Sequence, residues 1–145
     1  MYNVNRFIVK QDEVYDSVLK ELKNGKKVSH WMWYIFPQLK DLGYSYNSMY
    51  YGIKNKQEAK EYMNNDVLRK RYVECCNILL NLKTNNIEEV LGDIDKLKLK
   101  SSLTLFLQID VLNKELYLKL LEKYYDKKIC QKTIDILEIR NQINL

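Results

Sequence analysis

The chain has 145 residues and a formal net charge of +5 at pH 7, which predicts one domain, spanning 1–145, with a modest preference for anionic partners. Hydrophobic residues make up 46% and charged residues 30%, and no run approaches the roughly 18 apolar residues of a membrane span, so membrane proteins are excluded. The three cysteines have neither disulfide nor metal-ligand spacing, and no signal-peptide pattern is present. We therefore expect a cytoplasmic protein without a metal or a cofactor.

Helical periodicity appears first near the N-terminus. Apolar residues recur at helical spacing over 14–22, after Asp12, which would cap the helix, and Gly25 would end it. The aromatic run 31–36 that follows would also suit a short strand, but no partner strand with period-two alternation is evident. The surrounding helices favour a helical or irregular structure for this run.

The rest of the chain shows helical periodicity in short runs that are separated by turn residues. The expected helices are 55–63, 66–80, 87–91, 101–109, 113–124 and 133–137. Gly92 would close the third of these, Ser101 or Ser102 would cap the fourth, and Thr133 would cap the last. The prediction is an all-α fold, a compact single-domain bundle of short helices with an aromatic-rich irregular segment.

That irregular segment concentrates the residue types that are rare elsewhere in the chain. The only histidine, both tryptophans and the only proline lie within 27–38, and eight of the 17 aromatic residues lie between Trp31 and Tyr51. Leucine and isoleucine alone are able to fill a core. Two indoles and a lone imidazole in one short stretch therefore indicate a built surface or pocket.

Two long blocks of sequence resemble a known family. They are His30–Gln38, continued by Leu42–Ser45, and Gly92–Phe106; a weaker third block lies within Glu58–Arg71. These blocks are similar to the uncharacterised family called domain of unknown function 1810, once mislabelled calpastatin-like. The resemblance spans about 7–133 and implies a compact, mainly helical single domain. It implies no established activity.

The C-terminal part departs from this family. After Lys123–Asp126, family members usually continue with a glycine and then an aspartate before a threonine, whereas this chain has Lys127 and Cys130 before Thr133. If that glycine and aspartate serve the site, the activity of this chain differs or is lost. If only a turn has changed, the site is unaffected.

A block of lysines alternates with leucines directly before the helix start expected at Ser101. In an extended segment, Lys96, Lys98 and Lys100 would point to one side. Free backbone N–H groups and serine hydroxyls at a helix start favour an anion such as phosphate. The candidate ligand-binding residues of this block are Lys98, Lys100, Ser101 and Ser102. A serine cap preceded by solvated lysines is the ordinary alternative.

The tryptophans are candidates for holding a planar group. Stacking a nucleobase on one aromatic side chain contributes roughly 1–3 kcal/mol, and Trp31 or Trp33 could supply this contact. Lys27, which precedes them, could steer phosphates, and Gln38 could orient a ligand or cap a backbone group. Alternatively, both tryptophans belong to the core, where aromatic residues contribute most of the packing energy.

His30 is the candidate general acid or base, because imidazole is the side chain best suited to proton transfer near neutrality. It would need a carboxylate partner such as Asp95. A lone histidine is more often a hydrogen-bonded structural residue, and a buried ion pair between Asp95 and Arg71 would by itself explain both of them. No second histidine is present to favour a metal site, and the adjacent Cys75 and Cys76 fall at core positions of a helix.

The leading hypothesis is a protein that binds a small phosphorylated, base-containing ligand: a nucleotide, a cyclic dinucleotide or an ADP-ribose derivative. Its use would be sensing or sequestration, for example in a viral protein that removes an immune signal. The first alternative is a hydrolase or N-glycosidase that acts on the same ligands, and the second is a protein-interaction module. DNA is an unlikely partner, because the lysines are scattered and no arginine-rich helix stands out. A homo-oligomer is left open.

Overall fold

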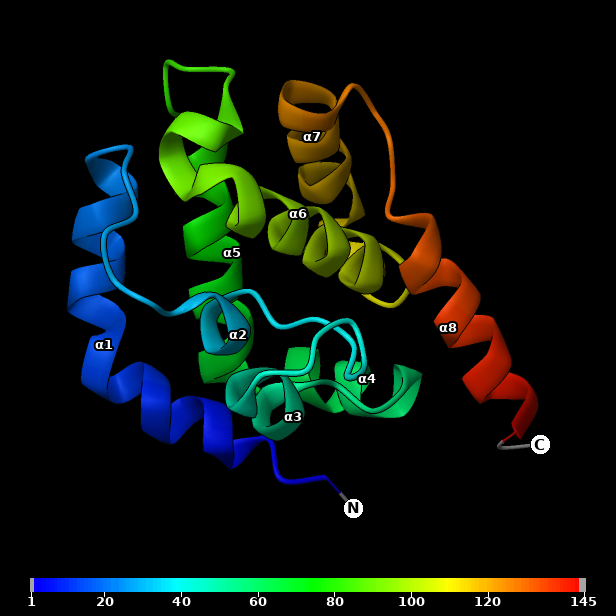
Figure 1. Ribbon diagram of the computed structural model, residues 1–145. Helices are drawn as coiled ribbons and strands as arrows, with labels where there is room; N and C mark the ends of the chain where they lie inside the picture. The colour runs from blue at the N-terminus through cyan, green and yellow to red at the C-terminus, as the bar shows by residue number, and fades with distance from the viewer. Residues whose placement is uncertain (1, 144–145) are drawn as a thin grey trace.

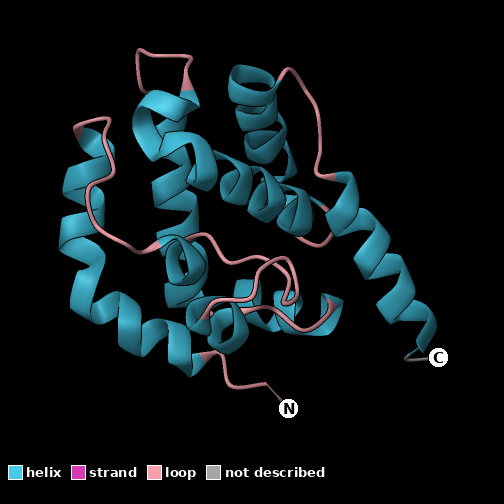
Figure 2. Cartoon of the chain, viewed as in Figure 1, coloured by secondary structure: helices cyan, strands magenta, loops and turns pink. Residues whose placement is uncertain are grey.

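Eight α-helices and the loops that join them make up residues 2–143, the part of the chain that the computed structural model describes (Figure 1 and Figure 2). The helices are α1 (Asn5–Lys23), α2 (Met32–Ile35), α3 (Tyr46–Tyr51), α4 (Lys56–Asn64), α5 (Asp66–Leu80), α6 (Ile87–Leu107), α7 (Lys114–Tyr125) and α8 (Gln131–Ile143). A 3₁₀ turn, Val111–Asn113, precedes α7, and no strand occurs within residues 2–143. The predicted all-α fold is confirmed. The aromatic run 31–36 forms the single turn α2 inside a long loop.

The core is built around α5, which packs against α1, α4 and α7, while α6 packs against α7 and α8 (Figure 1). Aromatic rings meet edge to face where these helices touch. The ring of Tyr72 lies 4.8 Å from that of Phe106 and 5.8 Å from that of Tyr117, and all three side chains are buried. Each such ring removes a large apolar area from water, so these contacts contribute most to the stability of the framework.

The first helix begins earlier than the sequence pattern predicted. α1 starts at Asn5 and not after Asp12, because Phe7 and Gln11 extend its buried face by two turns. Gln11 interrupts the apolar pattern, yet its amide is satisfied inside the core: Nε2 donates to the backbone oxygen of Tyr34 at 2.7 Å and to the Tyr62 hydroxyl at 3.1 Å. Burying a polar residue that has such partners costs little free energy. The residue nevertheless interrupts the apolar repeat by which a helix is recognised in a sequence.

The helix start that was predicted at Ser101 or Ser102 is wrong. Gly92 breaks α6 with φ 88° and ψ 171°, and the helix resumes directly after it and continues to Leu107. Both serines therefore lie in the helix interior. The Ser101 hydroxyl donates to the Leu97 carbonyl oxygen at 3.1 Å, and the Ser102 hydroxyl lies 2.8 Å from that of Tyr72. Serine side chains that bond to the preceding turn or to a neighbouring helix need no cap position.

The long loop between α1 and α4 crosses the front of the molecule in Figure 1 and carries α2 and α3. All residues from Trp31 to Leu39 are buried. Leu39 and Ile53 form an isolated parallel bridge, which brings the two halves of the loop together. Gly52 permits this approach, since a Cβ atom there would lie 2.5 Å from the Ser48 carbonyl oxygen and 2.6 Å from the Lys40 Cα atom.

The turn between α7 and α8 explains part of the departure from the family pattern. Asp126 and Lys127 adopt positive φ angles of 54° and 64°, a conformation in which glycine has no steric penalty. The turn that a glycine would favour is therefore kept. α8 begins at Gln131, two residues before the predicted cap at Thr133. No helix within residues 2–143 is long and apolar enough to cross a membrane.

Candidate functional site

Six of the residues singled out in the sequence line one hollow. It has a volume of about 220 Å³ and lies between the loop before α2, the start of α3 and the middle of α6. We call it the Lys27–Lys98 hollow. It is lined by Lys27, residues 30–33, Ser45, Asn47, Asp95 and Lys98. Folding thus joins the aromatic segment to the lysine block, which is more than 60 residues away in the chain.

Two lysines and one aspartate form an ion cluster at this hollow. Asp95 Oδ2 lies 2.9 Å from Lys27 Nζ, and Oδ1 lies 3.1 Å from Lys98 Nζ. The Lys27 side chain is only 7% exposed, whereas that of Lys98 is 29% exposed. Burial alone would raise the pKa of Asp95, but the hydrogen bonds from Lys27 and Lys98 outweigh it and lower that pKa. The carboxylate stays ionised, and the cluster keeps one net positive charge.

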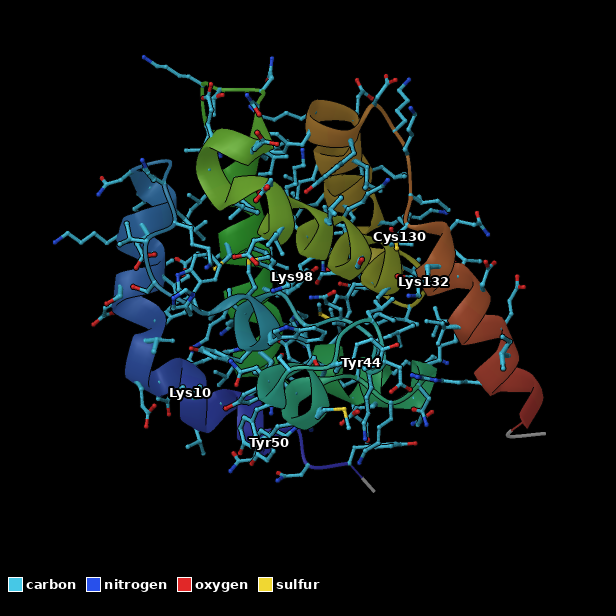
Figure 3. All side chains as sticks on the ribbon, viewed as in Figure 1. Lys10, Tyr44, Tyr50, Lys98, Cys130 and Lys132 are labelled. Atoms are coloured by element: carbon cyan, nitrogen blue, oxygen red, sulfur yellow. The ribbon has the colours of Figure 1, made fainter. Side chains whose placement is uncertain are left out.

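The lysine ammonium groups also lie over the two indole rings. Lys27 Nζ is 5.1 Å from the centre of the Trp31 ring, and Lys98 Nζ is 6.0 Å from that of Trp33. A cation within about 6 Å of an indole face is attracted by the ring quadrupole. Each lysine is thereby held by a carboxylate and a ring, so the charges of the hollow are preorganised. Lys98 can be found on α6 in Figure 3.

The two tryptophans belong to the core and also form a wall of the hollow. Trp31 is 1% exposed and Trp33 is 6% exposed. A Cβ atom at Gly43 would lie 3.2 Å from the Trp33 ring, so the glycine leaves room for the indole. Neither ring presents an open face to solvent. Of the two interpretations of the tryptophans, the structure shows core side chains and no open stacking platform at either ring.

Glu21, on α1, organises the loop that enters the site, and sequence reasoning missed it. Its Oε1 atom accepts hydrogen bonds from the backbone N–H groups of Val28 and Ser29, at 2.6 and 2.8 Å, and from Trp31 Nε1 at 3.0 Å. Its Oε2 atom accepts from the Ser29 hydroxyl at 2.7 Å. Burial alone would raise the pKa of Glu21, but these hydrogen bonds lower it to about 2. No local sequence pattern marks such a residue.

His30 lies on the exposed part of the same loop and lines the hollow from its rim. Its backbone oxygen accepts a hydrogen bond from the Tyr34 hydroxyl at 2.6 Å, which fixes the main chain at this point. The Lys27 N–H group donates to the Val90 carbonyl oxygen at 2.7 Å and ties the loop to α6. The imidazole is therefore carried by a fixed backbone and is accessible from solvent.

The other candidate residues do not reach this hollow. Ser101 and Ser102 are buried inside the helix packing, and Lys100 lines a separate hollow of about 290 Å³ with Lys96, Tyr124 and neighbouring residues. Gln38 is 3% exposed, and its Nε2 atom has no hydrogen-bond partner among the described residues. Of the predicted ligand-binding set, only the residues of the Lys27–Lys98 hollow are brought together.

A larger hollow, of about 320 Å³, lies beside α4 and the 3₁₀ turn, but its chemistry is less suited to a ligand. The Asp110 carboxylate there already accepts hydrogen bonds from the Tyr117 hydroxyl at 2.5 Å and from the Asn113 amide at 2.8 Å. Arg69 is paired with Asp66 at 2.7 Å. Within residues 2–143, no three histidine, cysteine or acidic side chains gather to hold a metal ion.

Comparison with known proteins assigns the chain to a family. Residues 1–137 match the model of a family described as "Protein of unknown function (DUF1810)". The chain belongs to the DUF1810 family. The chain is similar to the conserved hypothetical protein Rv1873 from Mycobacterium tuberculosis, whose crystal structure is known: the two are 39% identical, the match covers 94% of this chain and 97% of that one, and the TM-score is 0.91. No curated protein matches the chain. The family resemblance and the all-helical DUF1810 fold are both confirmed.

Proposed function

We propose that this protein binds a small phosphorylated, base-containing ligand in the Lys27–Lys98 hollow. Its ligand class is a nucleotide, a cyclic dinucleotide or an ADP-ribose derivative, and its use is to sense or to sequester that ligand. The observation that carries the proposal is the convergence of Lys27 and Lys98 on one hollow, where both are paired with Asp95.

Phosphate is the group that these two lysines favour. Each ammonium group has three N–H donors, and in each lysine one of them faces Asp95, so donors remain for phosphate oxygens. The indole rings shield the ammonium groups from water, which strengthens their attraction for an anion. Asp95 pairs with both lysines and so holds their two charges near each other.

The remaining lining groups suit the uncharged part of a nucleotide. The Ser45 hydroxyl and the Asn47 amide offer both donors and acceptors at the start of α3, where they can meet the edge of a base or a sugar hydroxyl. The two indoles border the hollow but are almost fully covered, so its polar groups make most of the contact with a ligand. The hollow is therefore more polar than most ligand pockets, which suits a phosphorylated ligand.

A second candidate function rests on Asp95. A carboxylate that stays ionised in a partly buried hollow can stabilise a developing positive charge or act as a nucleophile, as in glycoside hydrolysis. Its lowered pKa makes it a poor general acid, so His30 would have to transfer the proton. A hydrolase or N-glycosidase that acts on the same ligand class is therefore the alternative.

The first experiment is mass spectrometry of the purified protein, native and then denatured, to identify any bound nucleotide-like molecule. Isothermal titration calorimetry with adenine and guanine nucleotides and ADP-ribose then compares two variants. Lys98→Ala should weaken binding by about tenfold or more, because one of two phosphate contacts is lost. Lys100→Ala, two residues along the same helix but outside the hollow, should leave binding unchanged. Equal affinities of the two variants would place the binding site elsewhere.

Asp95→Asn separates the binding protein from the enzyme. In a binding protein, this change releases the lysines from a competing carboxylate, so affinity for a phosphorylated ligand should be kept or should rise. In an enzyme it should abolish turnover, as should His30→Ala. Chromatographic detection of cleaved nucleotide or free base decides between the two. Turnover by the wild type that both variants lose would replace the binding proposal by the enzymatic one.

A further inference from the structure

The start of α3 carries a group of exposed aromatic side chains beside the Lys27–Lys98 hollow. Tyr44 is 91% exposed and Tyr46 is 76% exposed, and they flank Ser45, which lines the hollow. Tyr50, one turn further along α3, is 46% exposed. We call these three residues the tyrosine rim. Figure 3 labels Tyr44 in the loop before α3 and Tyr50 on that helix.

The geometry of the rim is that of a stacking surface. The rings of Tyr46 and Tyr50 lie 5.9 Å apart with only 8° between their planes, so they form a parallel pair. Tyr50 in turn meets the buried ring of Tyr51 edge to face at 4.8 Å, which anchors the pair to the core. The outer ring, Tyr46, extends into solvent at the end of this row. A further flat ring can continue the row without any rearrangement.

The hollow alone is too small for a complete ligand of the proposed class. Pockets that enclose a drug-sized molecule measure about 300–1,000 Å³, whereas the Lys27–Lys98 hollow measures about 220 Å³. Part of the ligand must therefore extend past the rim. Ser45 and Asn47, which line the hollow, are the chain neighbours of Tyr46. A molecule that extends from the hollow over α3 would therefore contact the tyrosine rim.

We infer that the ligand is a dinucleotide: one base in the hollow, the linking phosphate at Lys27 and Lys98, and a second base on the tyrosine rim, stacked on the ring of Tyr46 that ends the row. This inference rests on the proposed nucleotide-binding function and selects among its ligands. A stacked base gains affinity without specific hydrogen bonds, which suits a rim of bare tyrosine rings. Lys27 and Lys98 would then bind the phosphate between the two positions of the bases, one in the hollow and one on the tyrosine rim.

Calorimetry with three matched ligands tests the inference, in an adenine and in a guanine series. The nucleoside monophosphate has one base, ADP-ribose or its guanine counterpart adds a phosphate and a sugar, and the linear or cyclic dinucleotide adds a second base. The wild type should bind a dinucleotide about tenfold or more tightly than the other two, which is the gain expected from one stacked base. The Tyr44→Ala/Tyr46→Ala double variant should lose this gain and keep its affinity for the monophosphate.

Two control variants isolate the role of the rings. Tyr44→Phe/Tyr46→Phe removes the hydroxyls but keeps the rings, so it should retain the gain. Leu112→Ala removes a side chain that is 92% exposed and lies outside the hollow, so it should leave all affinities unchanged. Because the exchanged residues are exposed, the variants should fold; unchanged affinity for the monophosphate verifies this.

The outcomes separate the inference from the function on which it rests. If the monophosphate binds through Lys98 and the dinucleotide binds no more tightly, the inference is wrong and the proposed function stands. If no ligand of either series binds, both are wrong. A dimer that dissociates in the Tyr44→Ala/Tyr46→Ala variant, measured by analytical ultracentrifugation, would assign the rim to a second copy of the chain and overturn the inference.

Discussion

The helical framework of α5, α6 and α7 and the site segment, residues 27–54, share one apolar core but differ in how their backbones are held. The framework is held by buried apolar and aromatic contacts such as the one between Tyr72 and Phe106. The site segment has one helical turn and one short helix, α2 and α3, and few backbone hydrogen bonds of its own. Its aromatic run is buried in the core, where the Phe36 ring meets that of Tyr72 at 5.6 Å, and charged side chains from other helices hold its loop backbone in addition.

Three charged residues outside the segment fix it at separate points. Glu21 of α1 holds residues 28–31. Arg6 of α1 donates from Nε to the Tyr50 carbonyl oxygen at 2.9 Å and pairs with the buried Glu58 at 2.9 Å. Arg140 of α8 donates to the carbonyl oxygens of residues 54 and 40 at 2.6 and 2.9 Å. These bonds satisfy loop carbonyl and N–H groups that have no helical partner.

The stability of the molecule and the geometry of its site can therefore be changed separately. Loss of apolar burial should unfold the whole chain. Loss of a single charged contact should displace the loop backbone of the site segment and leave the framework folded, because the buried aromatic residues of the segment remain in the core. Such local openings are typical of binding regions carried on a rigid scaffold.

The largest effect is expected in the framework. Phe106→Ala should lower the free energy of unfolding by about 3–5 kcal/mol, because it removes a fully buried ring and leaves a cavity between Tyr62 and Tyr72. Urea denaturation followed by circular dichroism measures this change. A loss of less than 1 kcal/mol would show that the core is not centred on these rings.

A smaller loss is expected for Glu58→Gln, which removes the charge of the Arg6 partner. Glu58 is fully buried, and its Oε1 atom also accepts from the Lys54 N–H group at 2.8 Å. A hydrogen bond to a charged group contributes about 1.5–3 kcal/mol, so we expect a loss in this range. Glu13→Gln, in an exposed pair with Lys10, is the matched control and should change stability by less than about 0.5 kcal/mol. Equal effects of the two changes would contradict the structural role of Glu58.

Glu21→Gln should affect the site more than the fold and should do so in a pH-dependent manner. The pKa of Glu21 is about 2 in the folded protein against an ordinary 4.5, so its charge stabilises the fold above about pH 4.5 and this contribution is lost as the pH falls toward 2. The difference in unfolding free energy between wild type and variant should therefore shrink below pH 4.5. A difference that stays constant from pH 7 to pH 3 would contradict this. Ligand affinity at pH 7 should fall, because the loop that carries Lys27 is loosened.

The smallest effect is expected at the start of α8, away from both regions. Cys130 precedes the first residue of α8, and its sulfur accepts a hydrogen bond from the Ser101 hydroxyl at 3.3 Å. Cys130→Asp should stabilise the protein by up to about 1 kcal/mol, because aspartate is a better N-cap than cysteine. Affinity at the Lys27–Lys98 hollow should not change. A change in affinity would show that the family's aspartate serves the site as well as the turn.

Part of the site could be predicted because its residue types are unusual. Trp31 and Trp33 and the lysine block at Lys98 were recognisable by rarity, charge and family resemblance. Glu21 and Gly43 could not be found in this way, because one is an ordinary acidic residue on a helix and the other an ordinary loop glycine. Their importance comes from the atoms that they meet: four hydrogen-bond donors of the loop for Glu21, and the Trp33 ring for Gly43.

The all-α class, most of the helices and the concentration of aromatic residues before α4 can be read from the chain, because helical periodicity and turn residues act over a few neighbouring positions. Packing places Ser101 and Ser102 inside a helix, and it pairs Asp95 with Lys27 and Lys98 rather than with Arg71, whose partner is Asp12. It also leaves the tryptophans covered and Tyr44 and Tyr46 exposed. These outcomes depend on contacts between residues far apart in the chain, and a local pattern carries no information about them.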